Sequence, residues 1–172
     1  MQKPEQNQVL KMFINQHFKQ HPDILTKERI MHSKGVADFI YCYCKANHVN
    51  DERIHELYII ALLHDIGYLE NHKGVNHSKK GVDLLSAIGI YPELLELIKY
   101  HGKYTDNPSE EQILFWLADM CINKDGHFEG YERRYESILT RYDSNDRRLN
   151  DVSKIIDYLR SHFPEYAGNK IT

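Results

Sequence analysis

Residues 50–67 read NDERIHELYIIALLHDIG, and this stretch decides the fold of the chain. It opens with an asparagine–aspartate pair that is well suited to cap a helix, and apolar residues then recur at helical spacing. Gly67 is a natural end for that helix, which places the adjacent His64 and Asp65 in its last turn. The stretch therefore predicts an amphipathic helix that carries a histidine–aspartate pair at its carboxyl end.

The helical pattern extends along the rest of the chain. Prolines occur only at plausible helix ends or joints, and no period-two alternation of apolar and polar residues persists. The other predicted helices span 6–20, 26–47, 77–89, 92–102, a segment that opens at Ser109 with a capping box to Gln112, 131–141 and 151–162. We therefore expect one all-α domain over 1–172, a helical bundle with flanking helices at 1–22 and 130–165.

The composition excludes several classes of protein. A length of 172 residues fits one domain, and 41% hydrophobic with 27% charged residues excludes a disordered chain, a collagen and a coiled-coil rod. Twenty-two basic against 25 acidic residues give a net charge of −3, which argues against broad binding to nucleic acid or anionic membranes. No apolar run approaches the ~20 residues of a membrane span, and the polar first residues do not form a signal peptide. Three cysteines are too few for a disulfide framework, so we expect a cytoplasmic location.

Eleven histidines beside a single tryptophan are the unusual feature of the composition. Five positions on separate predicted helices, or at their ends, combine imidazole and carboxylate groups: His32, His64–Asp65, His77, His101 and Asp119. These groups suit iron, manganese, cobalt, nickel and zinc, and α-bundles hold such metals between facing helices. Asp65 has two oxygens and can bridge two ions. Asp119 lies on an apolar helix, where an unpaired carboxylate is costly to bury unless a metal or solvent compensates it.

The other histidines are assigned no metal. His72, in the polar stretch 70–76 that follows the histidine–aspartate pair, is a weaker candidate. The remaining six are expected to lie at the surface or to be hydrogen-bonded in the core: His17, His21, His48, His55, His127 and His162.

The ordered series of these residues resembles a known family. The residues His32, Leu63-His64-Asp65-Ile66-Gly67, His77, His101 and Ala118-Asp119 occur in the order found in the HD-domain superfamily of metal-dependent phosphohydrolases. The His-Asp-Ile-Gly form of the central motif is a familiar subfamily pattern, and the resemblance covers roughly 28–124, the expected metal-binding core. It implies an all-α HD-type bundle with additional terminal helices.

The resemblance also implies a ligand set. His32, His64, Asp65 and Asp119 match the four ligands of the metal that the superfamily shares. His77 and His101 match the two further histidines of the binuclear members, in which the aspartate bridges both ions. Two divalent ions are therefore expected (Fe, Mn, Co, Ni or Zn), with His72 as a possible replacement for His77.

The implied activity is hydrolysis of a phosphate ester or anhydride, of a nucleotide or another small phosphorylated metabolite, by a metal-activated hydroxide that Asp65 helps to orient. In size and motif order the chain resembles small bacterial HD hydrolases, including the symmetrical dinucleoside tetraphosphatases. Lys80, one turn after His77, and Lys103 are candidates to neutralise substrate phosphate. Tyr68 stands where many members have a lysine.

Other residues near the motif series have smaller expected roles. Asn123, four residues after Asp119, is a candidate donor to a metal ligand, and no residue stands out as a general acid. The arginines between 133 and 148 are interleaved with acidic residues, so they are expected to form a plain charged face.

Alternative functions remain open at the level of the sequence. Some HD-type proteins are di-iron oxygenases with the same ligand series, and a regulatory module with a structural metal is a further alternative. A mononuclear site is also compatible with the ligands. The expected partner is a small phosphorylated substrate, with no nucleic acid polymer and no membrane, and the chain is expected to be a monomer or a homodimer.

Overall fold

The computed structural model describes residues 27–69, 76–142 and 146–168. Within these ranges the regular secondary structure is helical, with loops between the helices and one isolated β-bridge between Ile122 and Phe128, so the all-α prediction is confirmed. The α-helices are α2 (Lys27–Ala46), α3 (Asp51–Leu63), α4 (His77–Ala87), α5 (Pro92–Tyr100), α6 (Glu110–Cys121), α7 (Tyr131–Leu139) and α8 (Arg147–His162). Two short 3-10 helices, Ile66–Leu69 and Pro164–Tyr166, follow α3 and α8. The predicted helix at 6–20 lies outside the described residues.

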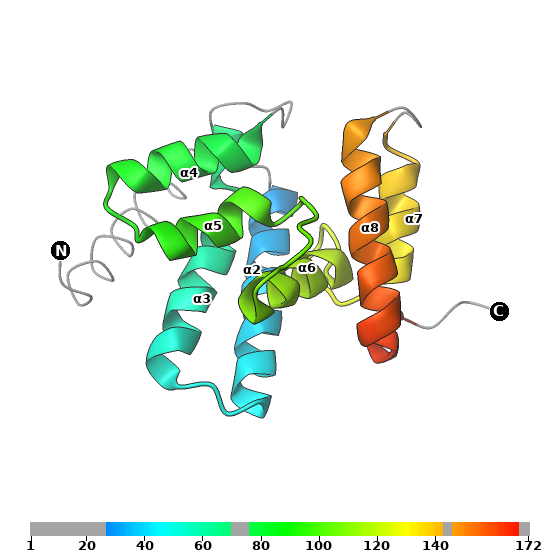
Figure 1. Cartoon of the computed structure of the whole chain (residues 1–172), viewed down its shortest axis with the longest axis horizontal. Coiled ribbons are helices and arrows are strands. Elements are labelled where there is room, and N and C mark those ends of the chain that lie inside the picture. Colours follow the sequence, from blue (N-terminus) through cyan, green and yellow to red (C-terminus); the bar gives the residue numbers. More distant parts are fainter. Residues whose placement is uncertain (1–26, 70–75, 143–145, 169–172) are drawn as a thin grey trace.

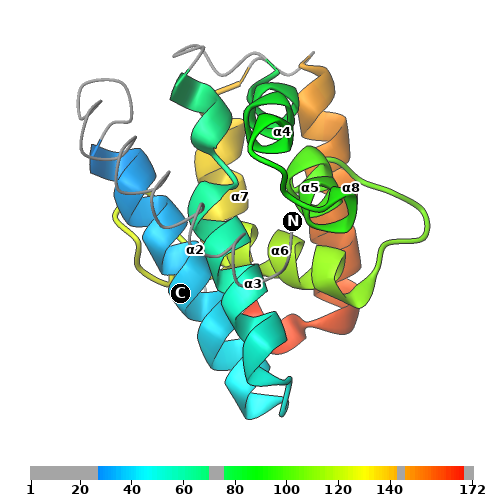
Figure 2. The same ribbon diagram turned by 90° about the vertical axis from the view of Figure 1, so that its left-hand side faces the viewer.

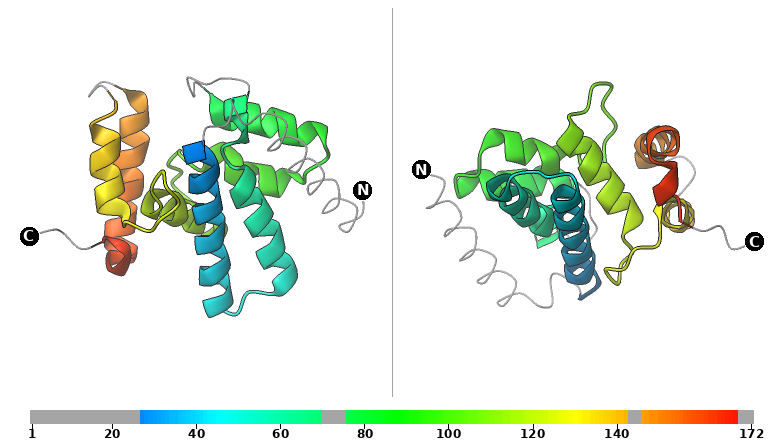
Figure 3. Two further views of the ribbon diagram at one scale, coloured as in Figure 1. Left: turned by 180° about the vertical axis from the view of Figure 1, so that it is seen from behind. Right: turned by 90° about the horizontal axis from the view of Figure 1, so that it is seen from below.

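The helices form two groups on either side of α6 (Figure 1). On one side α2 and α3 lie side by side, and α4 and α5 pack on each other next to them (Figure 2). On the other side α7 and α8 form a pair that the view from below shows well separated from α3 (Figure 3). Among the described residues, no helix is both long enough and apolar enough to cross a membrane.

Helix α6 takes part in two hydrophobic cores. Its Phe115 and Ala118 are buried in the core shared with α2 to α5. Its Trp116 and Leu117 are buried in the second core, which α7 and α8 complete with residues such as Ile156. Because alternate faces of one helix are buried against different partners, α6 fixes the α7–α8 pair relative to the rest of the bundle.

The helix that was predicted over 50–67 begins as expected but ends earlier. The Asn50 side chain accepts a hydrogen bond from the backbone N–H of Arg53 at 2.9 Å, which confirms the predicted cap. The α-helix itself ends at Leu63, and His64 is its C-cap residue. The histidine–aspartate pair therefore lies in the turn that joins α3 to the following 3-10 helix, and the predicted end near Gly67 was wrong.

The last helix also differs from its prediction. It begins at Arg147 rather than at 151, because the Asp146 side chain accepts a hydrogen bond from the backbone N–H of Arg148 at 2.9 Å. Asp146 is a favourable N-cap residue that the apolar periodicity alone does not reveal. The earlier start adds Arg148 to the helix, on the side that faces the candidate site.

Two glycines allow backbones to approach closely around the candidate site. A Cβ on Gly67 would overlap the carbonyl group of His77, so glycine is needed for α4 to begin against the turn after α3. A Cβ on Gly35 of α2 would likewise overlap the carbonyl group of Gly126, in the loop after α6. These contacts bring the start of α4 and the end of α6 next to the histidine–aspartate pair.

Candidate metal centre

The six side chains predicted as ligands meet between the helices. They are His32 on α2, His64 and Asp65 after α3, His77 at the start of α4, His101 after α5, and Asp119 on α6. Two groups of three, His32–His64–Asp65 and Asp65–His77–His101, each place possible ligand atoms within 4.8 Å of one another. Asp65 belongs to both groups and is 3% exposed, so a single buried carboxylate joins two potential metal sites.

The first group is completed by Asp119. His32 Nε2 lies 2.8 Å from Asp119 Oδ1, and His64 Nε2 lies 3.6 Å from Asp65 Oδ2 and 3.9 Å from Asp119 Oδ1. The four side chains expected to share one metal therefore turn their ligand atoms toward a common point.

The second group is equally compact. His77 Nε2 and His101 Nε2 lie 3.0 Å apart, and they lie 3.5 and 3.7 Å from Asp65 Oδ1. Two atoms bound about 2.1 Å from one ion at octahedral or tetrahedral angles are roughly 3.0–3.4 Å apart, so this spacing suits a common ion. His77 occupies the position expected of it, and its proposed replacement, His72, lies outside the described residues.

Backbone carbonyl groups orient three of the histidines. The Nδ1 atoms of His32, His64 and His101 lie 3.2, 2.7 and 2.6 Å from the carbonyl oxygens of Asn123, Ala61 and Ile98, respectively. Because a carbonyl oxygen only accepts, each Nδ1 carries the proton and each Nε2 faces the carboxylates. This is the arrangement by which proteins commonly fix a histidine that binds metal through Nε2.

Asn123 contributes to this arrangement in a different way from the prediction. Its backbone carbonyl, rather than its side chain, contacts His32. Its side-chain oxygen accepts from the backbone N–H groups of Asp125 and His127 and so holds the loop after α6.

The position of His101 depends on hydrogen bonds to the residue before it. Trp116 Nε1 and Gln112 Nε2 both donate to the carbonyl oxygen of Tyr100, at 3.0 and 3.1 Å. Ser109 does cap α6 by accepting from the backbone N–H of Gln112, but the Gln112 side chain does not complete the predicted capping box. It links α6 to the end of α5 instead, because the Tyr100 carbonyl at this helix end has no partner within α5 and accepts from several donors, including the backbone N–H of Lys103 at 3.1 Å.

The charges at the centre favour ionised carboxylates and a neutral histidine. Burial opposes ionisation of Asp65, but its neighbours, above all His64 and Arg29, outweigh burial and hold the pKa of this carboxyl well below its ordinary value. The pKa of Asp119 is lowered in the same way, mainly by its hydrogen bond to His32. Burial lowers the pKa of His101, which keeps a lone pair available on its imidazole.

These residues fit divalent metal ions. His64 Nε2 is buried and has no hydrogen-bond partner in the described part of the chain, although it lies close to two carboxylates. Such an atom is costly to bury unless a cation binds it. Mixed imidazole and carboxylate ligands are those that iron, manganese, cobalt, nickel and zinc accept.

A cavity of about 130 Å³ opens onto the candidate ligands Asp65, His77, His101 and Asp119. Arg29 and Tyr68 line it from the same half of the molecule, and the Arg29 Nη1 atom donates to Asp65 Oδ2 at 2.9 Å. The Arg29 guanidinium also lies 3.9 Å from the centre of the Tyr68 ring, which stacks on His77. Sequence reasoning missed Arg29, although it lies one turn before His32 and so shares its helix face.

The α7–α8 pair supplies further cations to the same cavity. Arg134, Arg141 and Arg148 line it together with Tyr142. The prediction of a plain charged face was therefore wrong for these three arginines, because the packing of α7 and α8 on α6 turns their side of the pair toward the candidate ligands.

The two lysines predicted to meet substrate phosphate are placed elsewhere. Neither Lys80 nor Lys103 is among the residues that line the cavity, and Lys103 is exposed beyond α5. The arginines occupy the position for which the lysines were proposed.

Comparison with known families agrees with this geometry. The family model described as HD domain matches residues 29–124, which contain all six candidate ligands and end before α7. Comparisons with curated proteins and with solved structures gave no significant match. The match covers more than half of the chain and includes the histidine–aspartate pair that joins the two groups of ligands, so the chain belongs to the HD domain family.

Proposed function

We propose that this protein is a metal-dependent phosphohydrolase that acts on a phosphate ester or anhydride of a small molecule. HD domains belong to a superfamily composed mostly of metal-dependent hydrolases. The observation that carries the narrower proposal is the cavity itself, in which candidate metal ligands and four arginines face the same space. Guanidinium groups recognise phosphate in this manner.

In this proposal, His32, His64 and Asp119 would hold one ion, His77 and His101 would hold another, and Asp65 belongs to both groups of candidate ligands. Two divalent ions in such a site polarise the phosphoryl oxygens and make water acidic enough to supply hydroxide near neutral pH. The carbonyl contacts of the three fixed histidines keep their Nε2 atoms directed toward the carboxylates, which is the orientation in which they could bind metal. Asp65 is the carboxylate proposed to orient the attacking water, and it also forms an ion pair with Arg29.

Arg29 and Tyr68 are the residues next to the ligands that are suited to contact the reacting phosphate. Arg29 lines the cavity from α2, and a guanidinium group at this place is suited to bind a phosphoryl oxygen. Burial, followed by the charge of Asp65, raises the pKa of Tyr68 to about 12, so its hydroxyl keeps the proton at neutral pH. Tyr68 can therefore donate a hydrogen bond to substrate at the position where other members use a lysine.

The arginines also separate this proposal from its alternatives. An oxygenase that acts on an uncharged substrate has no need of four cations around its metal site, and a purely structural metal has no need of an open cavity. The phosphohydrolase is the function that accounts for both features.

The test is turnover of a panel of nucleotides and phosphate esters by protein loaded with manganese, iron, cobalt or nickel. Phosphate release is expected with at least one of these metals, and Asp65→Asn, which keeps the size of the side chain, should reduce it to background. Asp83→Asn, an exposed position on α4, is the matched control and should retain full activity. Oxygen consumption by the iron-loaded protein without phosphate release, or full turnover by Asp65→Asn, would contradict the proposal.

A further inference from the structure

Three arginines of the cavity come from a part of the chain that the family match does not include. Arg134 lies on α7, Arg141 follows it, and Arg148 lies on α8, all beyond residue 124. They line the same cavity as Asp65 and His77. The α7–α8 pair thus adds a second group of charges to the candidate metal centre.

The arginines differ in how their charges are compensated. Arg148 is held by Asp146, to which its Nε and Nη2 atoms donate at 2.9 and 2.5 Å. Arg141 Nε donates only to a neutral acceptor in the described residues, the backbone carbonyl of Ser137 at 3.0 Å. Arg134 Nε is buried and has no hydrogen-bond partner within those residues. Within the described residues, neither Arg134 nor Arg141 forms an ion pair with a carboxylate, so these two cations are suited to bind an anionic ligand.

Positive charge is also concentrated at this point. Burial, then the neighbouring charges of Arg134 and Arg29, lower the pKa of Arg141. Like charges that share a cavity repel, and a buried donor without an acceptor is costly. Both costs are removed when an anion with several acceptor oxygens binds between the two side chains.

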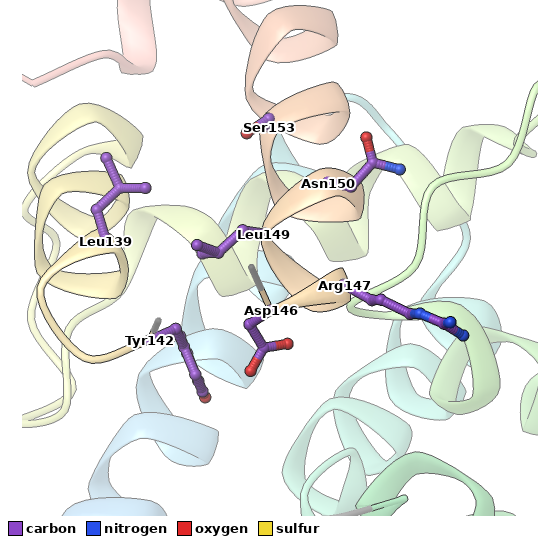
Figure 4. A pocket seen from close by; sticks show the side chains of 7 residues that line it. All are labelled: Leu139, Tyr142, Asp146, Arg147, Leu149, Asn150 and Ser153. Atoms are coloured by element: carbon purple, nitrogen blue, oxygen red, sulfur yellow. The ribbon is translucent and has the colours of Figure 1, made fainter. Parts of the chain in front are cut away.

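A groove on the α7–α8 pair adjoins the cavity. Tyr142 and Leu149 line the cavity and also line this groove with Leu139, Asp146 and Ser153 (Figure 4). Because Tyr142 and Leu149 line both spaces, the groove is next to the cavity and provides a surface where the outer part of a longer ligand can lie. An extended ligand suits this arrangement better than a single phosphate group.

We propose that the substrate carries at least two phosphate groups, and that Arg134 and Arg141 bind a phosphate other than the one that reacts. The proposal rests on the proposed function for the identity of the reacting phosphate. It narrows the substrate to the class of diphosphates and longer oligophosphates, including their nucleoside esters. Arg134 and Arg141 are binding residues in this account, and the candidate metal ligands remain at the other end of the substrate.

The first experiment measures binding without turnover. Isothermal titration calorimetry in excess chelator compares methylenediphosphonate, which cannot be hydrolysed, with methylphosphonate, which has one phosphonate group. The wild-type protein should bind the diphosphonate about tenfold or more tightly, the factor that one charge-assisted hydrogen bond provides. Equal affinities for the two probes, or no binding of either, would overturn the proposal.

Charge-matched variants identify the residues responsible. Arg134→Gln and Arg141→Gln should each remove most of the preference for the diphosphonate, whereas Arg133→Gln should keep it. Arg133 is exposed on the same helix and does not line the cavity, so it provides the same change in net charge. Unchanged preference in both cavity variants, with native circular dichroism spectra, would also overturn the proposal.

Steady-state kinetics distinguish this proposal from the proposed function. Both cavity variants should raise KM for a nucleoside diphosphate or triphosphate several-fold, with little effect on a monophosphate ester. Equal effects on all substrates would leave the phosphohydrolase intact and reject the second phosphate site. A diphosphonate preference in a protein that hydrolyses no phosphate compound would reject the phosphohydrolase and retain the anion site.

Discussion

The two sides of the cavity are built on different principles. On the side of α2 to α5, the functional groups are buried and fixed by backbone carbonyls, as His64 is by Ala61 and His101 is by Ile98. On the side of α7 and α8, they are arginines whose long side chains line the cavity, such as Arg134 on α7 and Arg141 just after it. If the proposed function is correct, the comparison teaches that fixed groups on one side carry out the reaction, whereas longer and more adjustable side chains on the other side select the ligand.

Helix α6 is the element that makes the two sides depend on each other. Trp116 is fully buried in the core with α8 and also donates to the carbonyl oxygen of Tyr100 at the end of α5. Trp116→Ala should therefore destabilise the whole domain by about 3–5 kcal/mol, the usual cost of a large cavity. Chemical denaturation followed by fluorescence of a site-specific label on α8 and by far-ultraviolet circular dichroism checks this value. Two separate transitions would show that the halves fold independently and would contradict the account.

Removal of metal should lower the stability of the protein, because it leaves the buried candidate ligands without a cation. A ligand that binds only the folded state at 100 times its Kd adds about 2.7 kcal/mol of stability, so chelation should lower the free energy of unfolding by a similar amount. Thermal unfolding of the metal-loaded protein with and without excess chelator provides the measurement. A melting temperature that is unaffected by chelator, with metal analysis proving that the ions were removed, would contradict the fit of these residues to metal.

A substitution at Gly67 tests whether the close approach of α4 to the turn after α3 is needed to position His77. Gly67→Ala forces α4 away from the turn after α3, because the new methyl group overlaps the His77 carbonyl. The variant should lose about 1–3 kcal/mol of stability through overpacking and should lose the ion held by His77 and His101. Gly102→Ala is the matched control, since a Cβ there meets nothing within 4 Å. Equal metal content and stability of the two variants would show that this close approach is unimportant.

The reactivity of the buried cysteines measures the opening of each hydrophobic core without any substitution in the protein. Cys44 lies in the core of α2 to α5 and Cys121 in the core of α6 to α8, whereas Cys42 is exposed. Burial raises the pKa of the Cys121 thiol to about 12, so at pH 8 very little of it is the reactive thiolate.

A thiol reagent should therefore label Cys42 in the native protein without affecting its stability. Cys44 and Cys121 should react only on unfolding, and at one common rate. Faster labelling of Cys121 alone would mean that the α7–α8 pair opens independently of the rest of the bundle. The two sides of the cavity would then differ in mobility as well as in composition.

Most of the fold could be predicted from the sequence because it depends on local pattern, and the cluster of candidate ligands could be predicted because their order resembles that of a known family. Helical spacing and caps such as Asn50 predicted most of the helices, and the ordered histidines and aspartates predicted the side chains that meet. The ends of helices were harder to predict, since α3 ends at Leu63, four residues before the glycine that was expected to end it.

The remaining features depend on tertiary contacts that a linear pattern does not encode. Gln112 was expected to bond within its own helix end, but it binds the carbonyl of Tyr100, which is 12 residues away. Arg134 and Arg133 are neighbours with the same chemistry, and only the packing of α7 decides which of them lines the cavity. The residues that could not be predicted from the sequence are therefore those whose partners are decided by how the helices pack on one another.

The central claim is that one carboxylate, Asp65, joins two metal sites, and the number of ions per chain tests it most directly. Inductively coupled plasma mass spectrometry of protein saturated with manganese or cobalt should find two ions in the wild type and one in His101→Gln. Asp65→Asn should lose metal from both sites. A single ion in the saturated wild-type protein, or an unchanged count in His101→Gln, would contradict the account.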